Sequence, residues 1–282
     1  MLDENRAGPR EAVAASLVMA ESLLTECWHK LDRAKEHLKA LDEEIGVFLD
    51  SKPAVVVREY DAQPPRYLFR VRIMRAIPQT RWALIIGDCV HNLRSALDYI
   101  AWRLAGSDLA DRATLFPICD TPEQFENSRQ RRLSRIHGDA VAEIVRCQPY
   151  NRPDPHPSAL WTLHELDVRD KHKLLTTTYM FNPSGSVAVH TAGPGATFSR
   201  DPRCEHDSVI AELPFPNLPP GSPDPQAKVD ADFAFEIAFE RGIIDPIGNY
   251  EVRGSLRGIV KTVEGVISHF DGLLARNPEW LL

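Results

Sequence analysis

A run of hydrogen-bonding side chains near residue 90 has the types and the spacing that chemistry requires. His91, Arg94 and Asp98 are spaced i, i+3, i+7, so on a helix they line one side of two turns. Asp88 stands three residues before His91 and presents a carboxylate together with that imidazole. The set is compatible with a structural Asp–Arg–His network, with a catalytic or ligand-binding site, or with a metal site.

Segment 86–102, which contains this set, divides into an apolar arc and a polar arc when it is plotted at 100° per residue. The polar arc holds short hydrogen-bonding groups, one guanidinium and two aromatic rings, whereas a solvated face is dominated by Lys and Glu. Such a mixture suits a partly buried network, in which nearly every polar group needs a partner. We therefore predict that Arg94 is buried and hydrogen-bonded to a carboxylate, either Asp98 or one on another helix. The members of the polar arc are Asp88, His91, Asn92, Arg94, Ser95, Asp98, Tyr99 and Trp102.

A second polar cluster is the segment Glu165–His172. Asp170 and His172 fall where a helix predicted over 158–170 must end. At a helix end the last carbonyls lack intrahelical partners, and cationic side chains are favoured there. We predict that Asp170 and His172 contact the Asp88–His91 turn and form one composite site with it.

A composite site of carboxylates and imidazoles could bind a metal ion, as in helical di-iron proteins. Those proteins repeat Glu-x-x-His on two helices, and neither Asp88-x-x-His91 nor His164-x-x-Asp167 matches that pattern. The cofactor therefore stays open. The sequence also lacks a Gly-x-Ser-x-Gly elbow, a P-loop and a His-Glu-x-x-His motif. The candidate metal ligands are Asp88, His91 and His172. The candidate catalytic residues are Asp88, His91, Arg94, Asp98, Asp170 and His172.

Charge limits the classes of partner. The chain has 33 Lys and Arg against 40 Asp and Glu, a formal net charge of −7, which excludes a general nucleic-acid or membrane-surface binder. A local basic run is nevertheless present. A solvated loop or helix face explains this run, and contact with phosphate is the alternative. Its members are Arg129, Arg131, Arg132, Arg135 and His137.

The elements that must position these residues are long helices at both ends of the chain and strands in the middle. Apolar residues from Val13 to Phe48 alternate steps of four and three, which predicts one helical seam that needs a partner to cover it. A similar seam runs over 252–273, so we also predict a homo-oligomer that shares apolar surface between subunits. Helices are predicted over about 10–50, 80–105, 139–147, 158–170 and 250–275. Strands are predicted over about 54–60, 67–75, 174–181, 186–191, 208–213 and 229–240.

This order of elements predicts an α+β fold, in which a long antiparallel helical bundle carries an inserted antiparallel β-sheet in one intertwined domain over 1–282. The 282 residues, 43% hydrophobic and 26% charged, are typical of a globular protein. The five cysteines are widely spaced, which favours reduced thiols and a cytoplasmic location. The first residues lack a signal-peptide pattern, and no apolar run approaches the length of a membrane span.

The segment from Gly87 to Asp98 resembles a family of bacterial proteins, frequent in actinobacteria, that share a G-D-x-x-H-N-L-R-S-A-L-D stretch. Phe116-Pro117-Ile118, Gln148-Pro149-Tyr150 and Asp170-Lys171-His172 are similar to later landmarks of that family. The resemblance covers roughly residues 28–180, and it implies no particular activity.

A second resemblance is to HEPN domains, four-helix-bundle proteins that often act as dimeric ribonucleases in defence and toxin systems. Their hallmark is an Arg followed by four to six residues and a His, commonly with a polar residue after the Arg. Here Ser95 follows Arg94, but Tyr99 stands where the His is expected. Tyrosine, with a pKa of about 10, is a poor general acid or base near neutral pH. The resemblance therefore implies a HEPN-like protein that binds RNA or a small molecule in a defence or stress context without cleaving RNA.

Two other functions stay open on sequence alone. One is a metal-assisted enzyme with its site between the Asp88–Asp98 helix and the Glu165–His172 segment. The other is a structural dimer held by the apolar seam over 13–48.

Overall fold

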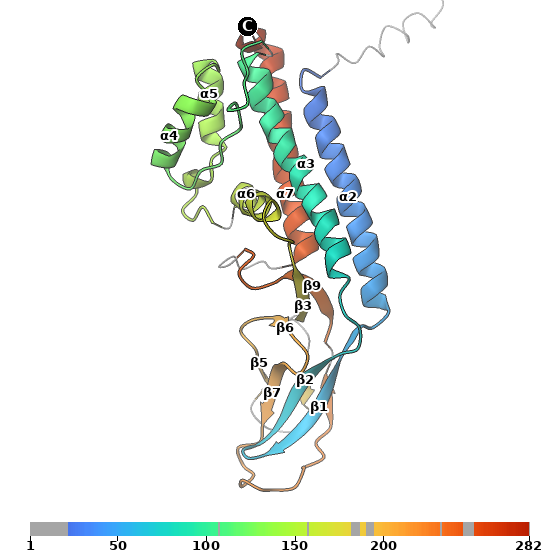
Figure 1. The fold of residues 1–282 in the computed structure, drawn as a ribbon. Coiled ribbons are helices and arrows are strands. Elements are labelled where there is room, and N and C mark those ends of the chain that lie inside the picture. The colour runs from blue at the N-terminus through green and yellow to red at the C-terminus, as the bar shows by residue number, and fades with distance from the viewer. Residues whose placement is uncertain are drawn as a thin grey trace, which may run out of the picture.

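The computed structural model describes residues 22–106, 108–156, 158–181, 187–189, 195–231, 233–244 and 251–281. Within these ranges the protein is an α+β fold of six α-helices and antiparallel sheets, which confirms the predicted fold class. The molecule is elongated, with the long helices at one end and most of the strands at the other (Figure 1).

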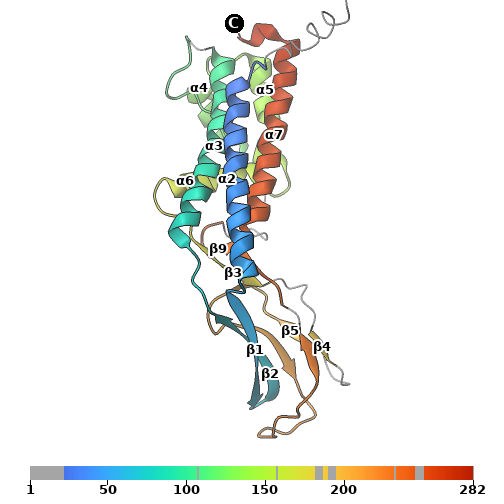
Figure 2. The same ribbon diagram turned by 90° about the vertical axis from the view of Figure 1, so that its right-hand side faces the viewer.

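Three long helices pack side by side: α2 (Thr25–Asp50), α3 (Gln79–Ala105) and α7 (Val252–Arg276). Helix α2 runs toward the strands, whereas α3 and α7 both run away from them (Figures 1 and 2). The arrangement therefore differs from the all-antiparallel bundle that we predicted. The difference arises because α3 and α7 each follow a β segment, so both start at the same end of the molecule.

The apolar seam of the first helix is covered within one chain. A turn at Ser22–Leu24 precedes α2, so the predicted helix over 10–50 is found from Thr25 onward, and Val13, Leu17 and Ala20 lie outside the described residues. From Leu24 to Phe48 the seam is buried within one chain, so these residues do not support the homo-oligomer, which stays a prediction. The buried members of the seam are Leu24, Cys27, Leu31, Ala34, Leu38, Leu41, Ile45 and Phe48.

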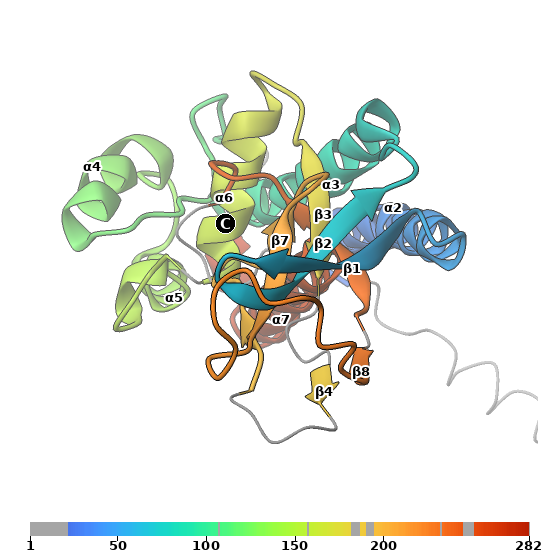
Figure 3. The ribbon, with the colours of Figure 1, turned by 90° about the horizontal axis from the view of Figure 1, so that it is seen from below.

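The strands form three small antiparallel sheets (Figures 2 and 3). The strands predicted over 54–60 and 67–75 are confirmed as β1 (Ala54–Ala62) and β2 (Pro65–Ile73), which pair as a hairpin in a sheet of order β1-β2-β7-β5. The strand predicted over 229–240 is two strands, because the pairing breaks before Phe235 and each part joins a different sheet. The remaining strands are β3 (Thr177–Phe181), β4 (Val187–Val189), β5 (Thr197–Phe198), β6 (Arg203–Cys204), β7 (Val209–Pro214), β8 (Val229–Ala231) and β9 (Phe235–Phe239).

Three shorter helices flank α3 and α7: α4 (Pro122–Arg132), α5 (Gly138–Arg146) and α6 (Ala159–Asp170). Thr121 caps α4 by accepting a hydrogen bond from the Gln124 backbone N–H. Ser158 caps α6 in the same way, accepting from the Trp161 N–H. Helix α6 packs on both α3 and α7, which brings the second predicted polar cluster to the polar face of α3 (Figure 1). Two 3-10 turns complete the described elements, Pro149–Asn151 and Pro278–Leu281.

Candidate functional site on helices α3 and α6

Arg94 is the most buried charged side chain on the polar face of α3, with only 7% of the residue exposed. Its Nη2 donates to Asp98 Oδ1 at 2.7 Å, one turn further along the helix, and also to the Phe116 carbonyl. The predicted burial of Arg94 and its pairing with Asp98 are therefore confirmed. Its second nitrogen, Nη1, is buried and has no hydrogen-bond partner within the described residues.

Asp98 links α3 to the segment that precedes α4. The oxygen that accepts from Arg94 also accepts the Phe116 backbone N–H at 2.9 Å, so one carboxylate orders both the guanidinium and the loop. Burial raises the pKa of Asp98 above its ordinary value, while Arg94 and the Phe116 N–H act in the opposite direction. The pair of Arg94 and Asp98 therefore stabilises the junction between α3 and the loop before α4. Because Asp98 Oδ1 already accepts two hydrogen bonds, this oxygen is not available to a ligand.

Two further basic side chains lie within electrostatic reach of Arg94. Arg132, the last residue of α4, is half-buried, and its pKa is lowered by burial and then by the charge of Arg94. His164, on α6, is also half-buried, and burial followed by Arg94 lowers its pKa. A His whose pKa falls below its ordinary 6.5 is neutral at pH 7, so this imidazole has one nitrogen that donates and one that accepts.

The carboxylate of Asp170 contacts helix α3 at Gly87. A Cβ built on Gly87 would lie 2.5 Å from Asp170 Oδ1, so only glycine leaves room for this carboxylate against the helix. Burial raises the pKa of Asp170, and the neighbouring Asp167 and Asp88 raise it further, while His91 lowers it. The predicted contact of Asp170 with the Asp88–His91 turn is thus supported, and Asp88 and His91 are themselves exposed.

His172 does not lie at this contact between α6 and α3. Helix α6 ends at Asp170, and the chain then turns, so that the His172 N–H bonds to the Arg169 carbonyl and the side chain is exposed. No group of three or more His, Cys, Asp or Glu side chains in the described part of the chain is placed to hold a metal ion. The proposed metal ligands Asp88, His91 and His172 therefore receive no support as a set from the described residues.

The far side of the polar arc serves helix packing. Asn92 donates to the Asp88 carbonyl and accepts from Lys30 of α2 at 3.3 Å. The same Lys30 nitrogen lies 5.9 Å from the centre of the Tyr99 ring. Tyr99 therefore lies on the side of α3 that faces α2, whereas Arg94 bonds to Asp98 and to the Phe116 carbonyl.

Sequence reasoning placed Arg132, His164 and Asp167 outside the candidate list. Asp167 is buried and pairs with Lys171 at 2.6 Å. One signal could have found the α6 members, because His164, Asp167 and Lys171 repeat the i, i+3, i+7 spacing of His91, Arg94 and Asp98. The basic run already contained Arg132 as a possible phosphate contact, but its electrostatic interaction with Arg94 depends on how α4 folds back.

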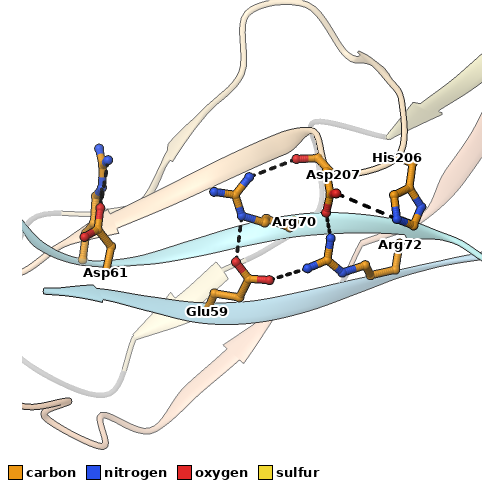
Figure 4. A network of polar contacts seen from close by, with 7 residues as sticks. Glu59, Asp61, Arg70, Arg72, His206 and Asp207 are labelled. Carbon is orange, nitrogen blue, oxygen red and sulfur yellow. Dashed lines mark hydrogen bonds and ion pairs between the residues drawn. The ribbon is translucent and has the colours of Figure 1, made fainter. Parts of the chain in front are cut away.

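Several arginines elsewhere in the described residues are neutralised by carboxylates. On the β hairpin Glu59 accepts from both Arg70 and Arg72, and Arg72 also pairs with Asp207, which His206 approaches (Figure 4). In the described part of the chain, by contrast, Arg131 and Arg132 make no ion pair or hydrogen bond. The end of α4 is thus one of the places where positive charge has no ion pair within the described residues.

Comparison with models of protein families, with curated proteins and with solved structures finds no match to this chain. None of the helices in the described residues combines enough length and apolar character to cross a membrane.

Proposed function

We propose that the protein is a HEPN-like helical binding protein, of a bacterial defence or stress system, that binds RNA without cleaving it. The RNA surface is formed by the polar face of α3 together with α4 and α6. The observation that carries the proposal is the group of arginines at the end of α4, of which Arg131 and Arg132 make no ion pair or hydrogen bond within the described residues. We define the cationic surface as Arg129, Arg131, Arg132 and Arg135.

The chemistry of this surface favours RNA over a protein partner. Three of the four arginines are exposed, and only Arg129 has an ion pair, a long one of 3.4 Å to Glu126. Guanidinium groups bind phosphates bidentately. The arginines of this surface have no short carboxylate partner within the described residues, so binding a phosphate breaks no strong ion pair. A small cationic surface on an acidic chain confines a polyanion to one face and repels it elsewhere.

Binding without cleavage is proposed because of Tyr99. This residue stands where a HEPN ribonuclease has its imidazole, and it lies against Lys30 of α2 and away from Arg94. The cytoplasm is the proposed location, since all five cysteines are free and four of them are buried.

The binding experiment measures the affinity of the full chain for a short single-stranded RNA by fluorescence anisotropy at several salt concentrations. Replacing Arg129, Arg131 and Arg135 by Gln removes three charges, so the slope of log K against log salt should fall by about 2. The matched control replaces Arg33, Lys39 and Arg200, which are exposed and lie outside this surface. Equal loss in both triple variants, or no RNA binding by the unmodified chain, would contradict the proposal.

One observation favours a second candidate, an RNA-cleaving enzyme. His164 supplies from α6 an imidazole within electrostatic reach of Arg94, whereas α3 carries Tyr99 at the position where the HEPN His is expected. RNA cleavage by the unmodified chain that disappears in His164→Gln, with RNA binding retained, would establish this candidate and remove the binding-only proposal.

A further inference from the structure

The two faces of the β1–β2 hairpin carry different kinds of side chain. Residues directly opposite each other in an antiparallel pair point to the same side, so Arg58 shares one face with Phe69, and Arg70 shares the other with Val57. The arginines of the second face pair with carboxylates, as Figure 4 shows for Arg70. Arg58 makes no ion pair within the described residues, although it shares its face with the buried Phe69.

A cleft of about 730 Å³ lies along the Arg58 face of the hairpin. Its walls are the end of α2, strand β1 and the segment from β8 to β9. Phe69 of the hairpin contacts Phe233 of the opposite wall, with ring centres 5.6 Å apart. Val55 and Ala234 are exposed lining residues, so the cleft opens to solvent and a ligand can enter it. A cleft of this size, mostly apolar with a few polar groups, is typical of a small-molecule site.

The cleft is bounded at both ends. At one end Arg58 Nη1 donates to the Ala227 carbonyl at 3.2 Å, which ties β1 to the segment before β8. At the other end α2 packs against β9, and Leu49 and Phe235 line the cleft there. The strand from Ala54 to Arg58, which lies between these ends, spans about 13 Å. A small molecule fits between the two ends, whereas a long extended peptide would have to pass through them.

The described charged residues that line the cleft are both cations, Lys52 and Arg58, and neither makes an ion pair within the described residues. The guanidinium carbon of Arg58 lies 4.5 Å from the centre of the Tyr67 ring, which holds the group in place. Apart from the bond to Ala227, its N–H groups have no partner in the described chain. The Tyr67 hydroxyl donates to Asp224, so this carboxylate already has a partner of its own. The cleft therefore favours an anionic group over a cationic one.

From this lining we propose that the cleft binds a small organic carboxylate with an apolar body, of which octanoate is a simple example. The carboxylate pairs with Arg58, and the charge of Lys52 adds to the attraction. The apolar body packs against Val56, Phe69 and Phe233. The cleft lies among the strands, at the end of the molecule away from α4 (Figure 1), so the inference goes beyond the proposed RNA binding and does not depend on it.

The experiment titrates the full chain with octanoate by calorimetry at constant ionic strength. The test variant Arg58→Gln removes the charge of an exposed side chain, and the matched control Arg70→Gln removes one from the opposite face of the same hairpin. We expect saturable binding of one octanoate, weakened about tenfold by Arg58→Gln because a charged hydrogen bond is lost, and changed less than about twofold by Arg70→Gln. Hexanoate, which is shorter by two methylenes, should bind about tenfold more weakly than octanoate.

The unmodified chain supplies a test that does not depend on how a variant folds. Octyltrimethylammonium has the same apolar body with the opposite charge, and it should bind at least about tenfold more weakly than octanoate. Acetate has the charge without the apolar body, and it should not bind measurably. Absence of octanoate binding, equal binding of octanoate and octyltrimethylammonium, or equal weakening by Arg58→Gln and Arg70→Gln would overturn the proposal.

Discussion

Arg94 organises the candidate site at the scale of single residues. It neutralises Asp98, and Asp98 in turn holds the Phe116 N–H, so one ion pair connects α3 to the segment that leads into α4. The pairing could be predicted from the i, i+4 spacing and from a face without lysines. The Phe116 carbonyl and Arg132 could not, because loops and returning helices bring them to Arg94 through tertiary packing.

Arg94→Ala should destabilise the fold by about 3–5 kcal/mol, because it leaves the mostly buried carboxylate of Asp98 unpaired. Urea unfolding of the full chain measures the difference. Arg81→Ala, which breaks the pair of an exposed arginine with Glu44, is the control and should cost much less than Arg94→Ala. A loss below about 1 kcal/mol for Arg94→Ala would show that the pair is not structurally important.

Asp201, among the strands, supplies a pH-dependent prediction at the same scale. Burial raises its pKa, but hydrogen bonds from Arg203 and Arg241 outweigh burial and lower the pKa to about 2 from 3.8. A carboxylate whose pKa is lower in the folded than in the unfolded state stabilises the fold at pH values above its unfolded pKa. This stabilisation is lost as the pH falls toward the folded pKa of about 2.

Asp201→Asn should therefore cost stability at pH 7 and progressively less between pH 4 and pH 2. The cost at pH 7 should be about 1 kcal/mol, since solvent screens this partly exposed carboxylate. Urea unfolding at several pH values measures it, with Asp108→Asn, an exposed residue, as the reference. A cost that is the same at pH 7 and near pH 2 would exclude this account.

At the scale of elements, the site depends on how α6 lies against α3. The sequence predicts both helices and the spacing on each, and it predicts that Asp170 reaches the Asp88–His91 turn. It does not predict that His172 is exposed, because this depends on α6 ending at Asp170 and the chain turning away. It also misses the break before Phe235, because the alternation of Phe and acidic residues continues through it.

Gly87 provides a test of this packing. Gly87→Ala should gain less stability than its helix propensity supplies, because the new Cβ must displace the Asp170 carboxylate. In an Asp170→Ala background the clash is gone, so the same change should stabilise α3 by up to about 1 kcal/mol through helix propensity. Unfolding free energies of the four chains form a double-mutant cycle. Additive effects of the two changes would mean that Asp170 and Gly87 are not in contact.

At the scale of the whole molecule, the strands and the end of α4 differ in how far their positive charges are compensated. The strands carry arginines that Glu59 and Asp207 neutralise, whereas the cationic surface at the end of α4 is left largely uncompensated. The long helices, at the end of the molecule away from the strands, bury the apolar seam from Leu24 to Phe48 within one chain. Self-association stays a prediction, and sedimentation velocity tests it. A mass near twice 31.7 kDa would support it, and a mass of 31.7 kDa at micromolar concentration would contradict it.

The central claim is that α3, α4 and α6 together form the ligand surface. Backbone amide NMR of the full chain during titration with a short single-stranded RNA tests it most directly. We predict that the largest shift changes fall in His91–Asp98 and Arg129–Arg135, with the exposed face of α2 and the β1–β2 hairpin nearly unchanged. Shift changes confined to the hairpin or to α2, or none at saturating RNA, would contradict the claim.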